Sequence, residues 1–279
     1  MWYYISFWPQ LLMNNNPIGI FDSGIGGLTV AKEIVRQLPG ESLIYLGDTA
    51  RVPYGPRSKE VITKYAMELV NFLLGKKVKC LVVACNTISA VALPEIIKVS
   101  PVPVIGVVEP AVKKAVQVTK NKKVGIIGTQ GTIQSKAYEE KIKSLDPNIQ
   151  VFSAGCPLFV PLAEEGLHQH AVAKLVAEDY LNELIAADID TLVLGCTHYP
   201  LLLETIAETM GPNVALVDSA EPTAEELKKI LQERKLLSGN KNPNYEFYVT
   251  DAPERVYKVA KHFFGREMKN KLKKVTLPS

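Results

Sequence analysis

The sequence has few cysteines, and they are not spaced as metal sites or disulfide frameworks require. Its 279 residues contain four cysteines, none in a Cys-x-x-Cys pattern and none near a histidine at a zinc-finger spacing. Structural zinc is therefore not expected, and a disulfide-stapled secreted scaffold fits poorly with a chain of this length. We expect reduced thiols, no metal and a cytoplasmic location.

The sequence also lacks an opening segment of the kind that directs a chain to a membrane. Residues 1–13 are aromatic and apolar, but the stretch is short, contains Pro9 and has no basic start. It fits neither a signal peptide nor a membrane span. Met13 and the three asparagines after it resemble an alternative start, so we expect residues 1–13 to be an ill-ordered extension. No membrane partner is expected.

There is little net charge on the body of the chain. The formal net charge is +3. The excess comes from the C-terminal segment, where Glu267 is outnumbered by Arg266, Lys269, Lys271, Lys273 and Lys274. Nucleic-acid binding calls for a basic face on the folded body. We therefore expect no nucleic-acid partner, and we interpret the basic end as solvated and frayed.

What the chain does have is an alternation of short apolar runs and amphipathic segments. Hydrophobic residues make up 47% of it, enough for two cores. Strands are expected over 17–21, 42–46, 79–84, 102–107, 123–127, 149–153, 191–194, 214–217 and 246–250. Helices are expected over 28–38, 59–74, 89–99 (interrupted near Pro94), 134–145, 171–186, 221–232 and from 251 onward. Such alternation is typical of parallel, doubly wound α/β sheets.

Two stretches of the chain occur twice in altered form. Residues 81–87 (LVVACNT) are matched by 192–198 (LVLGCTH), and 19–24 (GIFDSG) by 125–130 (GIIGTQ). Cys85 and Cys196 lie 111 positions apart, and segments 19–24 and 125–130 are offset by 106. We predict two related α/β domains that face each other, with the two thiols on either side of one ligand.

Cys85 and Cys196 each end an apolar run, where a buried strand gives way to a helix. A single free cysteine is most often a small buried hydrophobe, which is our interpretation of Cys80 and Cys156. At a helix N-terminus the dipole and free amides favour a thiolate and lower its pKa from about 8.5. The residues that follow, Asn86 and Thr87 or Thr197 and His198, can hold a carboxylate or an ammonium group.

The first strand runs into a glycine-rich turn over residues 22–27. A dinucleotide fingerprint is excluded, because the pattern that starts at Gly24 would need glycine where Thr29 stands. Two interpretations remain open at this point. The amides and the side chains of Asp22 and Ser23 could meet a small polar ligand, or the turn could be purely structural.

Together these motifs resemble the glutamate racemases of the aspartate/glutamate racemase superfamily. The matching segments are 20–27 (IFDSGIGG), 47–49 (GDT), 52–55 (VPYG), 84–87 (ACNT), 109–110 (EP) and 195–200 (GCTHYP). The resemblance implies two α/β domains, residues 14–108 with 219–279 and residues 109–218. It implies racemisation of L- and D-glutamate without a cofactor, supply of D-glutamate for bacterial peptidoglycan, and a homodimer.

The resemblance also implies roles for particular residues. Cys85 would act on D-glutamate and Cys196 on L-glutamate, with Asp22 and His198 as the polar partners of the two thiols. A glutamate in segment 164–166 would support His198; we favour Glu165 over Glu164, although spacing does not decide between them. Substrate would be held by Asp22, Ser23, Tyr54, Gly55, Asn86, Thr87, Thr129, Thr197 and His198.

Two other functions are weighed against this one. A sister racemase acting on aspartate is opposed only by the family motifs. A thiol-based redox protein or a pure amino-acid-binding protein belongs to another class. Redox chemistry favours neighbouring thiols, which this chain does not offer, and a binding protein has no need of matched acid and base.

Overall fold

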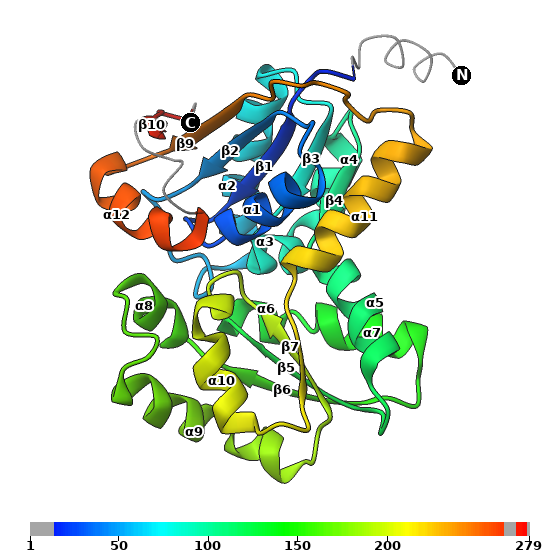
Figure 1. Cartoon of the computed structure of the whole chain (residues 1–279), viewed down its shortest axis with the longest axis vertical. Helices are drawn as coiled ribbons and strands as arrows, with labels where there is room; N and C mark the ends of the chain where they lie inside the picture. The colour runs from blue at the N-terminus through cyan, green and yellow to red at the C-terminus, as the bar shows by residue number, and fades with distance from the viewer. Residues whose placement is uncertain (1–13, 265–271, 278–279) are drawn as a thin grey trace.

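The computed structural model describes residues 14–264 and 272–277, which form two parallel β-sheets with helices on both faces of each (Figure 1). One sheet has six strands in the order β10-β9-β2-β1-β3-β4, and the other has four in the order β6-β5-β7-β8. The prediction of two doubly wound α/β sheets is confirmed. The expectation for residues 1–13 lies outside the described residues.

The six-stranded sheet forms the core of the upper lobe in Figure 1. Its strands are β1 (Ile18–Asp22), β2 (Leu43–Gly47), β3 (Cys80–Val83), β4 (Val104–Gly106), β9 (Tyr245–Val249) and β10 (Leu272–Lys274). One face is covered by α1 (Leu28–Gln37), α11 (Ala220–Glu233) and α12 (Pro253–Phe264). The other is covered by α2 (Lys59–Gly75), α3 (Asn86–Val91) and α4 (Leu93–Val99). Because both faces are covered, β1, β2 and β3 are buried along their whole length.

The four-stranded sheet forms the lower lobe. Its strands are β5 (Lys123–Gly128), β6 (Gln150–Gly155), β7 (Thr191–Gly195) and β8 (Ala215–Val217). Helices α8 (Phe159–Glu164), α9 (Ala171–Ala186) and α10 (Leu203–Met210) pack on one face, and α5 (Val108–Val118) and α7 (Ala137–Leu145) on the other. Short helices follow the two central strands: α6 (Gln130–Gln134) after β5, and the 3-10 helix η1 (Tyr199–Leu202) after β7.

The two sheets share one strand order, which is the structural form of the internal repeat. The order β2-β1-β3-β4 in one sheet corresponds to β6-β5-β7-β8 in the other. In each sheet the chain forms a central strand (β1 or β5), adds the next strand on one side of it (β2 or β6), and then adds two strands on the other side. Ligands of open α/β sheets bind beyond the carboxyl ends of the strands at such a switch point. Cys85 lies just beyond β3 and Cys196 just beyond β7, so both thiols occupy this position in their own sheet.

The chain passes from one sheet to the other twice, after β4 through α5 and after β8 into α11. Contacts of α3 with α6 and α7, and of α5 with α11, join the two lobes. The division at residues 109 and 218 stays a prediction, supported by the assignment of β5 to β8 to one sheet. Among the described residues, no helix is both long and apolar enough to cross a membrane.

Several elements differ from the sequence-based expectation. Helices α5 and α8 were not expected, because their short apolar faces resemble connecting loops. The helix expected over 134–145 is α7, which begins only after Lys136 with its φ of 56°, and the short α6 before it was not expected. The helix expected over 89–99 begins already at Asn86, and it breaks at Ala92, so that Pro94 lies in the first turn of α4.

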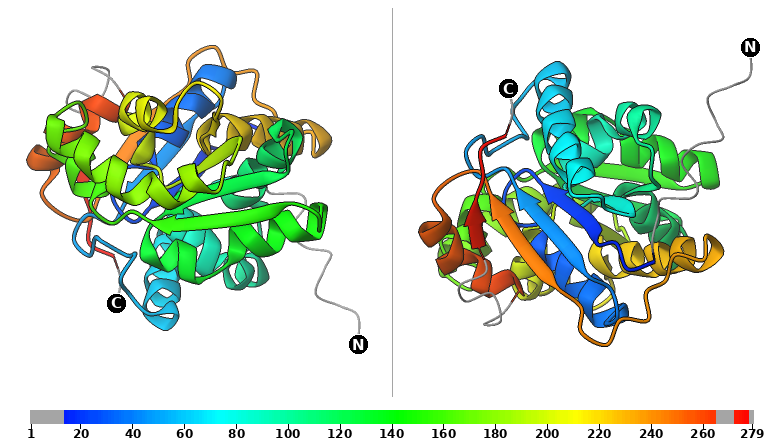
Figure 2. Two further views of the ribbon diagram at one scale, coloured as in Figure 1. Left: turned by 90° about the horizontal axis from the view of Figure 1, so that it is seen from below. Right: turned by 90° about the horizontal axis from the view of Figure 1, so that it is seen from above.

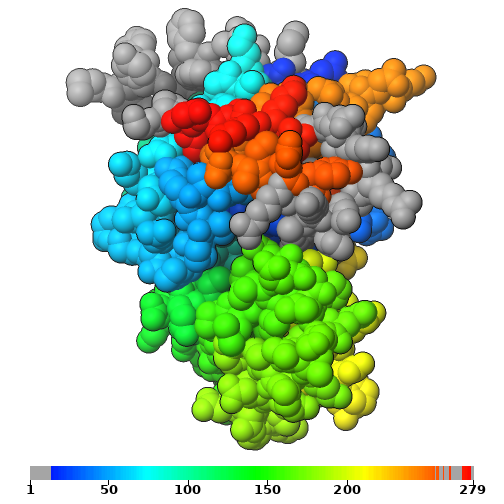
Figure 3. Space-filling model, turned by 90° about the vertical axis from the view of Figure 1, so that its left-hand side faces the viewer, coloured from blue at the N-terminus to red at the C-terminus, as the bar shows by residue number. Residues whose placement is uncertain are grey.

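The interpretation of the C-terminus as a frayed end is wrong for residues 272–277, although Lys273 and Lys274 are exposed to solvent as expected. Strand β10 pairs in parallel with β9 and forms the edge of the larger sheet (Figure 2, right, in red). Lys274 Nζ lies 2.7 Å from Asp251 Oδ1, and Lys273 Nζ lies 3.6 Å from Glu246 Oε2. Figure 3 shows this segment packed on the outer surface of the upper lobe. Arg266, Lys269 and Lys271 lie outside the described residues.

Candidate active site

A small cavity lies between the two lobes, at the carboxyl ends of β1, β3, β5 and β7. Its volume is about 30 Å³, far below the roughly 300–1,000 Å³ of ordinary ligand pockets. It is lined by Ser23, Val52, Pro53, Tyr54, Gly55, Cys85, Asn86, Thr87, Thr129, Val160, Cys196, Thr197 and His198. The structure therefore brings both thiols to one cavity, together with every predicted site residue except Asp22 and Glu165.

Cys196 faces a buried histidine. Cys196 Sγ lies 3.8 Å from His198 Nδ1, and His198 Nε2 lies 2.9 Å from Glu164 Oε1. Burial by itself would lower the pKa of His198, but the hydrogen bonds to Cys196 and Glu164 outweigh it and raise that pKa to about 10. The imidazole is therefore protonated at neutral pH, and Cys196 has a cation beside it.

Cys85 has the opposite surroundings. It stands at the N-cap of α3, and its Sγ donates to Ser23 Oγ at 3.3 Å. Burial raises the pKa of Cys85 to about 12, the nearby Asp22 carboxylate adds to the rise, and the Ser23 hydroxyl opposes it. The prediction that the helix N-terminus lowers this pKa is wrong, because the loss of hydration outweighs the helix dipole of a six-residue helix. Cys85 is therefore a protonated thiol at neutral pH.

Asp22 braces the glycine-rich turn beside Cys85. Its Oδ2 accepts hydrogen bonds from the backbone N–H of Gly24 and of Gly27, each at 3.1 Å. Its Oδ1 is buried and has no hydrogen-bond partner. The turn is therefore held by one carboxylate oxygen, while the other remains available as an acceptor.

Gly26 brings that turn against the Cys196 side of the cavity. A Cβ at this position would lie 2.3 Å from Thr197 Oγ1 and 2.4 Å from His198 Nδ1, well inside van der Waals contact. Thr29 Oγ1 adds a hydrogen bond to the Thr197 carbonyl at 3.3 Å. The turn of one lobe is thus in direct contact with the thiol loop of the other.

Hydroxyl groups form a chain across the cavity on its opposite side. Thr87 Oγ1 lies 2.9 Å from Thr129 Oγ1, which lies 3.0 Å from Thr132 Oγ1. The Gly131 N–H donates to the Gly55 carbonyl at 3.0 Å. These contacts join the loop after β2 to the start of α6, and they leave hydroxyls lining the space between the thiols.

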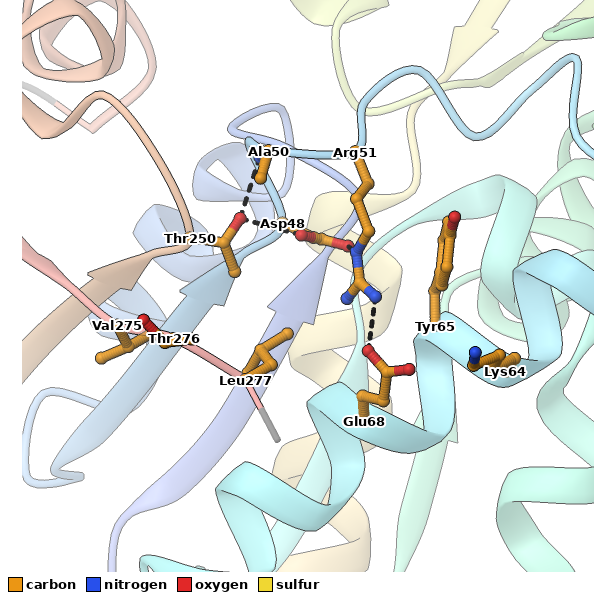
Figure 4. A pocket seen from close by; sticks show the side chains of 10 residues that line it. All are labelled: Asp48, Ala50, Arg51, Lys64, Tyr65, Glu68, Thr250, Val275, Thr276 and Leu277. Carbon is orange, nitrogen blue, oxygen red and sulfur yellow. Dashed lines mark hydrogen bonds and ion pairs between the residues drawn. The ribbon is translucent and has the colours of Figure 1, made fainter. Parts of the chain in front are cut away.

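Tyr54 is fixed by a buried ionic network behind the cavity. Its hydroxyl donates to Asp48 Oδ2, which also accepts from Arg51 Nε at 2.6 Å. The guanidinium of Arg51 is further paired with Glu68, and Thr250 Oγ1 donates to Asp48 Oδ1 at 2.8 Å (Figure 4). This network lines a second cavity of about 400 Å³, walled on one side by residues 275–277. The C-terminal segment thus lies close to the loop that carries Tyr54.

The predicted partner of His198 is wrong by one residue. Glu164 is the last residue of α8 and makes the contact, whereas Glu165 is its C-cap. Successive residues on a helix point about 100° apart, so only one of the two can reach the imidazole. Spacing along the sequence gave no way to choose between them.

Sequence reasoning also missed residues that act behind the cavity. Asp48 lies inside a quoted motif, yet nothing in the sequence pairs it with Tyr54. Tyr138, from the other lobe, and Ser219, at the start of α11, reach Asn86, and no local pattern marks either of them. Thr129 was predicted, because it corresponds to Ser23 in the internal repeat, whereas the neighbouring hydroxyl of Thr132 was not.

The fold and the paired thiols point to a class of amino-acid racemases, and comparison with known proteins agrees on that class. Residues 18–227 match the family described as Asp/Glu/Hydantoin racemase, and the chain belongs to this family of isomerases. Within it, the resemblance to glutamate racemase is confirmed. A glutamate racemase from Geobacter metallireducens is 51% identical over 252 residues, covering 90% of this chain and 93% of that protein.

Solved structures place the chain with the same proteins. A glutamate racemase isoform from Bacillus anthracis superposes with a TM-score of 0.92 at 43% identity, covering 95% of this chain and 99% of that one. A glutamate racemase from Francisella tularensis in complex with D-glutamate gives a TM-score of 0.89 at 42% identity, covering 95% and 98%.

Proposed function

We propose that the protein interconverts L- and D-glutamate without a cofactor, with Cys85 and Cys196 as acid and base on opposite faces of the substrate Cα. In a bacterial cytoplasm this would supply D-glutamate for peptidoglycan. The observation that carries the proposal is that two thiols, from the switch points of two sheets, line one small cavity. The names of the relatives support glutamate as the substrate.

The charges around the thiols assign them their starting roles. We assign Cys196, beside the protonated His198, the role of thiolate base, which takes the Cα proton of L-glutamate and forms a new S–H bond. The electron pair of the broken C–H bond stays on Cα as a carbanion. Cys85, held as a thiol by burial and by Asp22, delivers its proton to the other face and leaves D-glutamate. The reverse direction exchanges the two roles.

Polar groups around the cavity suit an amino acid with two carboxylates. The hydroxyls of Ser23, Thr87, Thr129 and Thr197 and the Asn86 amide can donate to carboxylate oxygens. The free Oδ1 of Asp22 can accept from the ammonium group. Among the described residues, the cavity lining includes no arginine or lysine, so these neutral donors and backbone amides would carry the recognition.

Hydrogen exchange tests the two-thiol mechanism. With protiated L-glutamate in heavy water, early D-glutamate should carry deuterium at Cα while the remaining L-glutamate stays protiated, and the mirror experiment should behave alike. The reason is that each thiol is monoprotic, so the proton removed is not the proton delivered. Substantial transfer of the original hydrogen into product would mean that a single base reaches both faces.

The same assay separates the alternative functions. Aspartate as substrate should give little racemisation, and faster turnover of aspartate than of glutamate would favour the sister activity. Treatment with a hydroxylamine-type reagent should leave activity intact. Loss of turnover that pyridoxal phosphate restores would overturn the cofactor-free claim. A protein that binds glutamate without racemising it would be a binding protein.

The homodimer belongs to the same proposal and is supported by the family resemblance alone. Sedimentation velocity across a range of protein concentrations tests it, with a dimer expected throughout. A monomer at every concentration would contradict it.

A further inference from the structure

One polar group in the cavity is buried and unused by the protein. Asn86 is 3% exposed and stands next to Cys85 at the start of α3. Its side-chain Nδ2 is buried and has no hydrogen-bond partner. A buried N–H without a partner is costly in a folded protein, by about 1–3 kcal/mol. Such a donor at a cavity therefore needs an explanation, and a ligand acceptor is the natural one.

The other end of the same amide is fully engaged. Asn86 Oδ1 accepts the Tyr138 hydroxyl at 2.6 Å and the Ser219 hydroxyl at 3.2 Å. An amide presents a carbonyl at one end and an NH₂ group at the other, so holding the oxygen determines which way the nitrogen points. Two hydroxyl donors facing Oδ1 therefore oppose a rotation that would exchange the two ends.

Tyr138 is well suited to this task. It is 2% exposed on α7, and Asn86 Oδ1 is the acceptor for its hydroxyl proton. Burial raises the pKa of Tyr138 far above its usual value, so the hydroxyl keeps its proton at any working pH. If the amide were reversed, this donor would face the hydrogens of an NH₂ group.

Ser219 links the same amide to the strand of the other thiol. It is the N-cap of α11, where the chain returns to the larger sheet, and it is 4% exposed. Its Oγ lies 3.5 Å from the carbonyl of Leu194, which is in β7 two residues before Cys196. The contact therefore spans from the strand of Cys196 to the residue beside Cys85.

We propose that Tyr138 and Ser219 are positioning residues that hold the Asn86 amide so that its Nδ2 donates to a carboxylate of the substrate. The inference rests on the proposed function, in which that substrate is glutamate. The Tyr138 hydroxyl comes from the other lobe, and the Ser219 hydroxyl comes from the point where the chain crosses back to the lobe of α3, so the donor is set where the two lobes meet.

A double-mutant cycle on glutamate binding tests this role. Tyr138→Phe keeps the buried ring and removes only the hydroxyl, and Ser219→Ala removes the second donor. The Kd for D-glutamate, measured by isothermal titration calorimetry, should rise about tenfold in Tyr138→Phe and less in Ser219→Ala. In an Asn86→Ala background, Tyr138→Phe should change Kd less than about twofold, because the group through which it acts is gone.

Kinetics and a matched control complete the test. KM should rise in Tyr138→Phe by more than kcat falls, since the change weakens binding rather than proton transfer. Tyr180→Phe, the same substitution on α9 of the same lobe, should leave Kd and KM unchanged. Thermal unfolding of each variant verifies that the lobe still folds.

The outcomes separate this inference from the proposed function. Equal effects of Tyr138→Phe with and without Asn86, or no effect at all, would overturn the positioning role while leaving the racemase proposal in place. A fall in kcat with an unchanged Kd would overturn it as well. A wild-type protein that neither binds nor racemises glutamate would overturn both.

Discussion

The two thiol sites occupy equivalent positions in two related sheets, yet their surroundings carry opposite charge. Cys85 has a hydroxyl at 3.3 Å and the Asp22 carboxylate nearby, whereas Cys196 has a protonated imidazole at 3.8 Å with Glu164 behind it. A repeated backbone thus delivers the same functional group twice, and the neighbouring side chains give the two copies different surroundings. In the proposed mechanism the related sheets supply the two faces of the substrate, and the difference in charge separates the roles of acid and base.

Removing either thiol, Cys85 or Cys196, should have the largest effect on the rate of racemisation. Cys85→Ala and Cys196→Ala should each lower the rate of racemisation by about 10²–10⁴-fold in both directions, because each direction needs one thiol as acid and the other as base. Circular dichroism from either enantiomer measures this. Cys156→Ala, a buried cysteine outside the cavity, is the matched control and should retain most of its activity. Near-normal turnover with only one of Cys85 and Cys196 would refute the two-thiol assignment.

A methyl group at Gly26 should disturb the surroundings of Cys196 and leave those of Cys85 unchanged. In Gly26→Ala the new Cβ would displace Thr197 and His198 by a large fraction of an ångström or more, and misplacement on this scale costs on the order of 10²-fold in rate. Gly75→Ala, where a Cβ meets open space, should behave as wild type. Alkylation of Cys85 should proceed at the wild-type rate in Gly26→Ala. Loss of activity together with a changed rate of Cys85 alkylation would argue for general disruption of the site.

Neutralising Asp22 or His198, the polar partners of the two thiols, should make kcat unequal in the two directions of racemisation. The enantiomers have equal free energies in water, so kcat/KM must stay equal in both directions, and the difference must be sought in kcat. Asp22→Asn and His198→Asn should each lower kcat about tenfold or more, and the more strongly affected direction should be opposite in the two variants. Cα-deuterium isotope effects in each direction measure the chemical step. A rise in KM with unchanged kcat would show that these residues only bind substrate.

A smaller effect is expected when the hydrogen-bond partner of the His198 imidazole, Glu164, is changed. Glu164→Gln removes the carboxylate charge that, together with Cys196, raises the pKa of His198 to about 10. The alkaline limb of the pH profile should move to lower pH, with activity at neutral pH reduced a few-fold. Glu165→Gln is the neighbouring control, and its profile should overlay that of wild type. The reverse pattern would restore Glu165 as the partner.

The smallest effect is on stability. An unfolded histidine has a pKa of about 6.5, and in the folded protein that of His198 is about 10. Its protonated form therefore stabilises the fold fully below pH 6.5, and this stabilisation is lost as the pH rises through 10. Urea unfolding at pH 6, 8 and 10 should show wild type losing stability relative to His198→Asn. A constant difference between the two proteins would contradict the shifted pKa.

The sequence allowed the strands and both thiols to be predicted, because buried parallel strands are continuous apolar runs and each cysteine ends one. It could not decide between Glu164 and Glu165, because the two side chains point about 100° apart on α8 and the sequence does not say which direction faces His198. The sign of the pKa shift at Cys85 was missed because the cost of burial depends on packing from other elements. Strand β10 was missed because its partner β9 lies more than twenty positions earlier, and three residues carry little pattern.

The small cavity has a consequence for the timing of each turnover. Its volume of about 30 Å³ is far below the roughly 300–1,000 Å³ of pockets that hold small molecules. We therefore expect the contact of Gly131 with Gly55, and of Gly26 with the loop of Cys196, to loosen when glutamate enters and again when product leaves. Separation of the two lobes would then contribute to the time that each turnover takes.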